Sequence, residues 1–533
     1  MTATPIEDPG PPPKSAGLTP GSLRLGAVVL AIAAIVGALV STRHGPDLGP
    51  DSVTYVSAAR NLVHGRGFTD FTKEPLTVFA PGYPAILAIG HFVGVGAESV
   101  GRFTNALVVG AIALLSFFLL RRHVSSPWIT LGAAALAALS SELLRVAAFI
   151  ATDPLFVLLT LVFIVLMEDI RTKPDRRALF IVLAGLVASC AFLVRYAAVP
   201  IFVSGVIVLA VYSAKEGWQA IARRTISFSA VSFIAPGLWI LRNATSGASD
   251  VLGIRVQSGD SPLTLARRLG ESAKDLVFSY RVPAVAALAA VLGGLVVAGS
   301  LAWRSRRDLL PRLSRTGTAM LPIVTLIVVG TVFVVIAHKT TGSDLNARML
   351  LPVWFPTIIL GAWLLDNLLI AGRKAGHERL VRLLSVAMVA FLFASMGWYF
   401  QQVAKGTSNA FHYSSENVTE LKTAIGRLPA STQILSNDPW RVYIATGRQP
   451  VFLAPMEVRP SFSHRPVSAD EVADALCTEP AVLLWFDESP ATQRGSVAHT
   501  LRRGTQIDLT DPRRVDGATL YTVERRENAP ACS

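Results

Sequence analysis

Long stretches without Asp, Glu, Lys or Arg divide this sequence, and they exclude most folds of water-soluble proteins. A bilayer-spanning helix needs about 20 predominantly apolar residues. Eleven stretches come close to that length, ten of them free of charge and one containing a single acid. They are Leu25–Thr42, Phe103–Leu120, Val124–Ser141, Val146–Met167 (with Asp153), Ala178–Val194, Tyr196–Ala214, Thr225–Leu241, Val282–Trp303, Thr316–His338, Met349–Leu365 and Leu383–Val403. We therefore expect an α-helical polytopic membrane protein with about 11 transmembrane helices.

The composition agrees with this interpretation. Only 16% of the 533 residues are charged and 52% are hydrophobic, which argues against a disordered chain and an ordinary cytosolic enzyme. The net charge of +13 would also suit a nucleic-acid-binding protein, but the basic residues lie in the loops between the apolar stretches. Three cysteines are too few for a disulfide scaffold or a Cys-based zinc site.

One further apolar run, Tyr83–Ala97, is only 15 residues long and has Pro81 and Pro84 at its start. This length favours a helix in the membrane interface over a spanning helix. If the run does not cross, five groups of basic residues face the cytoplasm, as the positive-inside rule expects. They are Arg121/Arg122, Arg171/Lys173/Arg176/Arg177, Lys215/Arg223/Arg224, Arg304/Arg306/Arg307/Arg312/Arg315 and Arg373/Lys374/Arg379. The N-terminus is then cytoplasmic.

The expected domain organisation follows from this topology. Residues 1–21 are Pro-rich and predict a disordered cytoplasmic tail. Residues 22–403 form the transmembrane domain, with residues 43–102 as a first outer loop that carries interfacial helices. Residues 404–533 differ from the basic transmembrane part in their charge, because the numbers of Lys+Arg (14) and Asp+Glu (15) are nearly equal there. Short apolar runs alternate with helical patterns in this segment, which indicates a small extracytoplasmic α/β domain.

Within that C-terminal segment, the expected strands and helices alternate along the chain. The strands are Gln433–Leu435, Val451–Leu453, Ala481–Phe486 and Leu520–Val523, and the helices are Glu416–Arg427 and Ser468–Leu476. Cys477 and Cys532 lie on the oxidising side in this topology, and the sequence leaves open whether they pair.

Two acids lie at outer ends of predicted helices, where ionisable residues are candidates for function. Asp51 follows the first span and precedes a helical pattern over Ser52–His64, so we expect it at the helix N-cap. Asp153 precedes Pro154 and is expected to cap the span that it begins. Capping alone would explain both residues. Facing one aqueous mouth, the two carboxylates could also share a divalent cation, or one could act as a general base.

Basic side chains also cluster at outer helix ends, where the positive-inside rule disfavours them. Long basic side chains at such positions commonly act as snorkelling anchors, but they would equally suit a phosphate at the membrane surface. The residues concerned are Arg195, Arg242 beside Asn243, His338 beside Lys339, and Arg348. A phosphate-binding loop of the Gly-x4-Gly-Lys-Ser/Thr type is absent, and no inverted repeat of interrupted helices indicates a transporter.

The order of several short motifs resembles the C-type (GT-C) membrane glycosyltransferases, in particular the branch of the lipid A aminoarabinose transferases and protein O-mannosyltransferases. The resemblance extends from about Leu23 to Tyr399. Its motifs are Asp51-Ser52-Val53-Thr54-Tyr55 with Ala58–Leu62 and Gly65–Phe68, Ala80–Pro84, Gly101-Arg102-Phe103-Thr104-Asn105, Thr152–Phe156, Leu193–Tyr196, Pro236–Asn243 and Arg348–Pro352.

This resemblance implies transfer of a sugar from a polyprenyl-phosphate carrier to a glycan, lipid or protein acceptor on the extracytoplasmic face, by single displacement with inversion. It assigns the catalytic acid to Asp51 and a second outer acid to Asp153. The donor phosphate and substrate would be held by residues of the quoted motifs and basic helix ends, namely Tyr55, Arg102, Arg195, Arg242, Asn243, His338, Lys339 and Arg348. Many relatives carry paired acids at the first site, whereas Ser52 follows Asp51 here, so the sequence does not require a metal.

Two other functions remain open at the level of sequence. One is a flippase or transporter of lipid-linked sugars, which would place its polar residues near the bilayer midplane. The other is a non-catalytic scaffold whose outer domain binds cell-envelope glycan. Neither predicts that Asp51 is needed for turnover.

Overall fold

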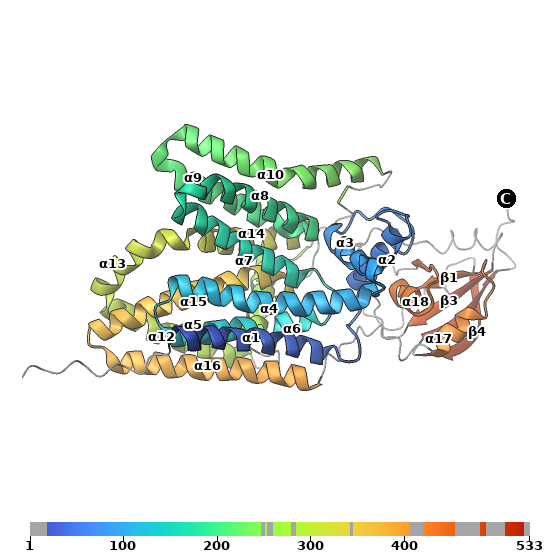
Figure 1. Cartoon of the computed structure of the whole chain (residues 1–533). Helices are drawn as coiled ribbons and strands as arrows, with labels where there is room; N and C mark the ends of the chain where they lie inside the picture. The colour runs from blue at the N-terminus through green and yellow to red at the C-terminus, as the bar shows by residue number, and fades with distance from the viewer. Residues whose placement is uncertain are drawn as a thin grey trace, which may run out of the picture.

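The computed structural model describes residues 19–246, 251–252, 259–278, 284–341, 345–405, 419–452, 480–486, 507–516 and 518–526. Long helices run side by side in one bundle, and a small sheet lies beyond one end of it (Figure 1). The bundle helices are α1 (Pro20–Ser41), α4 (Ala97–His123), α5 (Pro127–Ala138), α6 (Ser141–Ala147), α7 (Asp153–Thr172), α8 (Arg177–Val194), α9 (Val199–Ser213), α10 (Trp218–Thr245), α12 (Ala284–Arg304), α14 (Leu321–Thr341), α15 (Ala347–Lys374) and α16 (Glu378–Lys405).

Shorter elements connect these helices. Two more α-helices belong to the connections, α11 (Pro262–Val277) and α13 (Arg306–Thr316). Short 3-10 turns are η2 (Pro174–Arg176), η3 (Tyr196–Ala198), η4 (Ala214–Glu216) and η5 (Gly317–Met320). Residues 1–18 of the predicted tail lie outside the described residues, and α1 begins at Pro20.

The chain is a multi-pass membrane protein. Across the described ranges, eight helical stretches are long and apolar enough to cross a bilayer. Helices α7, α12 and α16 coincide with three further predicted spans. Helix α7 carries Glu168, Asp169 and Arg171 near its end, so that its composition is less uniformly apolar. The total of eleven spans stays a prediction.

Two of the predicted apolar runs are interrupted by helix ends. The run Val124–Ser141 is not one helix, because α5 ends at Ala138 and α6 starts at Ser141. The Ser140 hydroxyl between them accepts a hydrogen bond from the Leu143 backbone N–H (3.3 Å), which caps the new helix. The run Val146–Met167 is also interrupted. Helix α7 starts only at Asp153, where Pro154 favours a first helical turn.

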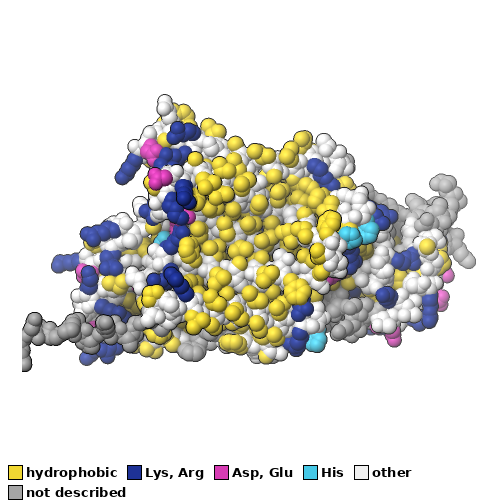
Figure 2. Space-filling model, viewed as in Figure 1, with side chains coloured by type: hydrophobic (Ala, Val, Ile, Leu, Met, Phe, Trp, Pro, Cys, Tyr) yellow, Lys and Arg dark blue, Asp and Glu magenta, His cyan; other side chains and the backbone are white. Residues whose placement is uncertain are grey.

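The surface of the bundle separates apolar from basic side chains. Figure 2 shows a broad hydrophobic band, with many Lys and Arg side chains at the end that lies away from the C-terminal sheet. Large apolar side chains such as Leu25, Leu107 and Leu241 are exposed within the bundle surface. Exposed residues of this kind are expected where a helix faces lipid.

The α1–α4 loop, residues 42–96, lies at the same end of the bundle as the sheet (Figure 1). It contains α2 (Pro50–Val63), α3 (Gly82–Ile89) and the 3-10 turn η1 (Gly90–Val93). The helical stretch ends at Gly94, whose φ of +70° suits glycine. Helix α3 with η1 coincides with the predicted non-spanning run, and Ile89, Phe92 and Val93 on it are exposed. Its placement in the membrane interface stays a prediction.

The C-terminal segment contains a five-stranded mixed sheet in the order β2-β1-β3-β5-β4. Strand β1 pairs in parallel with β2 and β3, and β5 pairs antiparallel with β3 and β4. The elements are α17 (Thr419–Gly426), β1 (Gln433–Ser436), α18 (Pro439–Thr446), β2 (Val451–Phe452), β3 (Ala481–Phe486), β4 (Ile507–Val515) and β5 (Ala518–Arg525). All four predicted strands coincide with strands of this sheet.

In the C-terminal segment, the sequence analysis missed two of the described elements, β4 and α18. In β4, the register shifts between Thr510 and Arg513 and the charged side chains there obscure the strand pattern. The predicted helix Ser468–Leu476 and both Cys477 and Cys532 lie outside the described residues.

Helix α18 joins the sheet to the α1–α4 loop. The rings of Trp440 and Tyr443 pack against Phe71, with centroids 6.3 and 5.3 Å away. The Gln449 side-chain amide also donates a hydrogen bond to the Phe71 carbonyl oxygen (2.8 Å). The apolar core beneath this contact includes Val53 and Tyr55 of α2, so the sheet domain is anchored close to that helix.

Candidate active site

Four helix ends bring two acids and two arginines together. Asp51 lies in the first turn of α2, after Gly49 and Pro50, and Asp153 is the first residue of α7. Arg195 directly follows α8, and Arg348 lies in the first turn of α15. We call these four residues the Asp–Arg cluster. Both acids lie in the first turn of a helix, where the positive end of the helix dipole attracts a negative charge.

Neither acid is the helix cap that the sequence predicted. Gly49 is the N-cap residue of α2 and Thr152 is that of α7, so both acids lie inside their helices. Their carboxylates contact arginines instead.

Arg348 bridges the two carboxylates. Its Nε donates to Asp153 Oδ2 (2.7 Å), and its Nη2 donates to Asp51 Oδ2 (3.0 Å). Arg195 Nη1 donates to Asp153 Oδ1, and Arg195 Nη2 contacts the Met349 sulfur (3.3 Å). Asp153 therefore accepts hydrogen bonds from two guanidinium groups, whereas Asp51 has one.

Burial differs between the two acids. The Asp153 side chain is 3% exposed, whereas that of Asp51 is 32% exposed. The formal charges of the Asp–Arg cluster sum to zero. Asp153 thus acts as the buried centre of the cluster, and Asp51 presents its carboxylate toward solvent.

Aromatic side chains pack around Tyr55, which lies one helical turn after Asp51. Tyr55, one helical turn further along α2, packs edge-on against Phe79 (5.0 Å between centroids) and Tyr83 (5.5 Å). Burial raises the pKa of the Tyr55 phenol, and the nearby Asp51 charge raises it further. The phenol is therefore neutral. Tyr83 in turn donates to the Asn105 side chain (3.0 Å).

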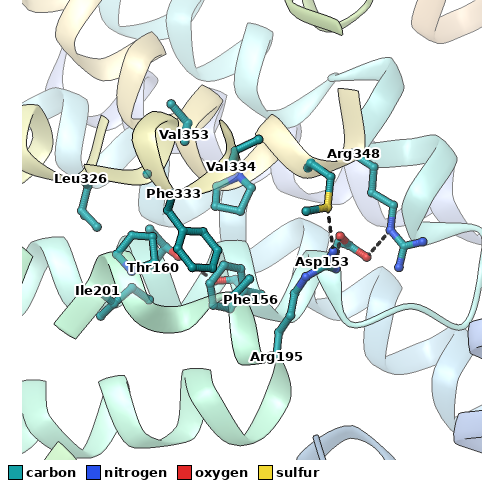
Figure 3. A pocket seen from close by; sticks show the side chains of 15 residues that line it. Asp153, Phe156, Thr160, Arg195, Ile201, Leu326, Phe333, Val334, Arg348 and Val353 are labelled. Carbon is teal, nitrogen blue, oxygen red and sulfur yellow. Dashed lines mark hydrogen bonds and ion pairs between the residues drawn. The ribbon is translucent and has the colours of Figure 1, made fainter. Parts of the chain in front are cut away.

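Three residues of the Asp–Arg cluster, Asp153, Arg195 and Arg348, line the polar end of a cavity in the helix bundle, and Asp51 pairs with Arg348 next to this lining. Figure 3 shows the charged side chains at one end and aromatic and aliphatic side chains at the other. Its lining is contributed by α7, α9, α14 and α15, together with Arg195 and Ala197. The apolar part of the lining contains Phe156, Pro200, Ile201, Leu326, Phe333, Val334, Pro352 and Val353. The cavity thus combines an ionic end with an apolar body inside the helix bundle.

The structure places Arg242 and Asn243 apart from this cluster. Arg242 donates to the carbonyl oxygens of Phe68 (2.9 Å) and Leu76 (3.3 Å), and to the Asn243 side chain (3.0 Å). Asn243 is fully buried and donates to the Val251 carbonyl oxygen (2.9 Å). These contacts attach the α1–α4 loop to the end of α10.

Three other predicted site residues also lie elsewhere. Arg102 donates to the Thr42 hydroxyl (3.0 Å) and the Leu39 carbonyl oxygen (3.1 Å), at the end of α1. His338 is buried and its Nε2 lies 2.8 Å from Asp260 Oδ2. Lys339 follows it and is exposed. Their proposed contact with substrate stays a prediction.

Solved structures of known proteins share this architecture at low sequence identity. ArnT from Cupriavidus metallidurans in its apo state superposes with a TM-score of 0.56 at 14% identity, covering 93% of this chain and 98% of that one. ArnT bound to undecaprenyl phosphate gives 0.55 at the same identity and coverage. The arabinofuranosyltransferase AftD from Mycobacteria gives 0.53 at 15% identity, covering 96% of this chain and 40% of AftD. No protein-family model and no curated protein matches the sequence.

The chain has the GT-C glycosyltransferase fold. The resemblance expected from the order of the motifs is thereby confirmed at the level of the fold. Within this GT-C fold, Asp51, Asp153, Arg195 and Arg348 contact one another in a single cluster, although they are spread over almost 300 residues of sequence.

Sequence reasoning missed several residues that shape the site. Tyr196 donates to the carbonyl oxygens of Thr77 (2.9 Å) and Phe79 (3.1 Å), and its hydroxyl accepts from the Trp239 indole N–H (2.8 Å). Arg145 interacts electrostatically with both Arg348 and Asp153. In the sequence, Glu142 and Arg145 are charged residues between two apolar runs, and this position could have indicated Arg145 as a site residue.

The donor atoms at the GT-C cavity do not fit a shared metal ion. No group of three or more His, Cys, Asp or Glu side chains gathers among the residues that the structure describes. The Arg348 guanidinium lies between the Asp51 and Asp153 carboxylates, at the place that a bridging cation would need. We therefore derive no catalytic step through a metal.

Proposed function

We propose that the chain transfers a sugar from a polyprenyl-phosphate-linked donor to the hydroxyl group of an acceptor on the extracytoplasmic face. One observation carries this proposal. Two guanidinium groups line the polar end of an apolar cavity in a membrane protein of GT-C fold, and one of them, Arg348, is paired with the partly exposed Asp51 carboxylate. The sugar is a hexose or a pentose, and the acceptor is a glycan, a lipid or a protein.

The chemistry of the cavity matches an amphipathic donor. Guanidinium groups bind phosphate oxygens through charge-assisted, bidentate hydrogen bonds. Arg195 Nη2 contacts only the Met349 thioether among the described residues, and a thioether is a weak acceptor that a phosphate oxygen readily replaces. The apolar lining from α9 and α14 would then receive the first isoprene units of the lipid tail.

In this proposal Asp51 is the general base. Its carboxylate takes the proton of the acceptor hydroxyl while the hydroxyl oxygen attacks the anomeric carbon. The bond between that carbon and the phosphate oxygen breaks, and polyprenyl phosphate leaves with the bonding electron pair. Arg195 and Arg348 stabilise the charge that develops on the leaving phosphate. A single displacement of this kind inverts the anomeric configuration.

A fold neighbour supports the donor class, because one ArnT structure contains undecaprenyl phosphate. We extend this ligand class to the present chain on the basis of the cavity and its two arginines. Arg242, Asn243 and Arg102 are proposed to act indirectly, since their contacts hold the α1–α4 loop and the end of α1. His338 and Lys339 remain proposed substrate contacts at the end of α14.

The distribution of basic side chains supports the orientation. Many Lys and Arg side chains gather at the end of the bundle that lies away from the sheet (Figure 2), whereas α2, which carries Asp51, lies at the sheet end (Figure 1). By the positive-inside rule, that end is cytoplasmic. We accordingly propose a cytoplasmic N-terminus, a transmembrane glycosyltransferase domain over residues 22–403, and an extracytoplasmic α/β domain over residues 404–533 in the cell membrane.

The function is tested by replacing the chromosomal gene with an Asp51→Asn variant and measuring lipid-linked sugars by mass spectrometry. We expect the unused donor to accumulate in the outer leaflet, where a membrane-impermeant reagent such as periodate reaches it. Accumulation in the inner leaflet would favour a flippase instead. A wild-type lipid profile in cells that contain folded variant would favour a non-catalytic scaffold.

A further inference from the structure

Arg348 holds its two carboxylates unequally. Asp153 is almost fully buried, lies 2.7 Å from Arg348 Nε and is also bound by Arg195. Asp51 is one-third exposed and lies 3.0 Å from Arg348 Nη2. The other Asp51 oxygen, Oδ1, accepts no hydrogen bond from the described residues. Since breaking a partly exposed ion pair costs much less than breaking a buried one, the Arg348–Asp51 ion pair is the first to break.

A phosphate entering the cavity needs the same donors. It can take Arg195 Nη2 from the Met349 sulfur at little cost. Arg348 Nη2 now donates to Asp51, so a phosphate oxygen that binds this nitrogen replaces the Asp51 carboxylate there. The Asp–Arg cluster is formally neutral without substrate, so the Asp51 charge opposes any arriving anion.

We infer that Asp51 and the donor phosphate compete for Arg348, so that donor binding releases Asp51 to act as the base. The inference rests on the proposed function. Without donor, the Asp51 carboxylate is held in its ion pair with Arg348. With donor in place, Arg348 turns to the phosphate and Asp51 faces the acceptor. The donor therefore binds before the acceptor is activated. Removing the Asp51 charge tightens donor-phosphate binding while abolishing transfer.

The test measures binding of undecaprenyl phosphate to the full chain in nanodiscs. We expect Asp51→Asn to bind this lipid roughly fivefold more tightly than the wild type, which corresponds to the loss of one partly exposed ion pair. Undecaprenol, which lacks the phosphate, should bind both proteins equally. Glu98→Gln is the matched control, because Glu98 is also about one-third exposed and pairs with Arg60 outside the cluster. It changes the net charge equally and should bind undecaprenyl phosphate as the wild type does.

The outcomes separate the inference from the proposed function. Equal or weaker binding of undecaprenyl phosphate by Asp51→Asn overturns the inference, provided that the wild type prefers this lipid over undecaprenol. A wild type without that preference overturns the proposed donor class and the inference with it. Should Asp51→Asn fail to fold, Asp51→Ser removes the same charge with a smaller side chain and is held to the same criterion.

Discussion

Asp153 is the most enclosed charge of the Asp–Arg cluster, and its loss would leave two arginines with too little negative charge nearby. We expect Asp153→Asn to destabilise the protein by about 3 kcal/mol, because breaking a buried ion pair leaves an uncompensated charge. A thermal melt of the purified chain should show a clear fall in Tm. A Tm equal to that of the wild type would contradict the buried, doubly paired geometry.

Tyr55 offers a test through pH dependence. Because burial raises the pKa of its phenol above the ordinary value of about 10, the wild-type side chain stays protonated throughout the neutral and mildly alkaline range. Tyr55→Phe should therefore leave the alkaline limb of the pH–rate profile for sugar transfer where it was. If the limb disappears in the variant, the phenol titrates during turnover and its environment differs from the one described.

Individual site residues could be predicted only in part. Asp51, Asp153, Arg195 and Arg348 were all selected from the sequence, and the structure brings these four together. Arg102, Arg242 and His338 were selected by the same logic but contact other partners. Hydropathy locates a residue at the outer end of a helix, but it does not say which neighbouring helix that residue faces.

At the level of secondary-structure elements, Gly82 controls how closely α3 approaches α8. A Cβ at this position would lie 2.7 Å from the Leu193 carbonyl oxygen, only two residues before Arg195. We expect Gly82→Ala to push these elements apart, lower Tm and reduce transfer, because backbone atoms cannot move aside as a flexible side chain can.

Gly237→Ala is the control for this substitution. Gly237 lies within α10, and nothing stands within 4 Å of a Cβ built there. Alanine is a better helix former than glycine, so this variant should keep or slightly raise Tm. A similar loss in both variants would show that close packing at Gly82 is not the cause.

Elements with a continuous apolar run or a regular hydrophobic periodicity were predicted. Elements in which charged, polar and apolar residues are mixed were not. The β3 segment Ala481–Phe486 is fully buried and was recognised as an apolar run. Strand β4 was missed, since its exposed central residues Asp511–Arg514 carry three charges and a proline. The α5/α6 break was missed because small apolar residues continue through it, and only the Ser140 cap marks the new helix.

At the scale of the whole molecule, the sheet domain and the α1–α4 loop should behave as one unit. Trp440→Ala removes a ring that packs on Phe71, two residues before the exposed Lys73. We expect faster tryptic cleavage after Lys73 in the full chain, because the loop opens more often when its support is lost. Trp218→Ala, which alters an exposed side chain at the start of α10, should leave that rate unchanged. Equal cleavage in all three proteins would contradict the docking contact.

The fold class followed from the sequence because apolar stretches of bilayer length leave few alternatives. The GT-C architecture needed the order of the motifs as well. The docking of α18 on Phe71 had no signal in the sequence. It depends on contacts between segments almost 370 residues apart, and α18 itself was not foreseen.

The separation between Asp51 and Arg348 also affects biosynthesis. Asp51 leaves the ribosome early, whereas the guanidinium that neutralises it follows 297 residues later. Until then, the nascent protein carries the Asp51 carboxylate without its final counter-charge. An incomplete polypeptide stalled before that point therefore contains this acid but lacks the arginine that pairs with it.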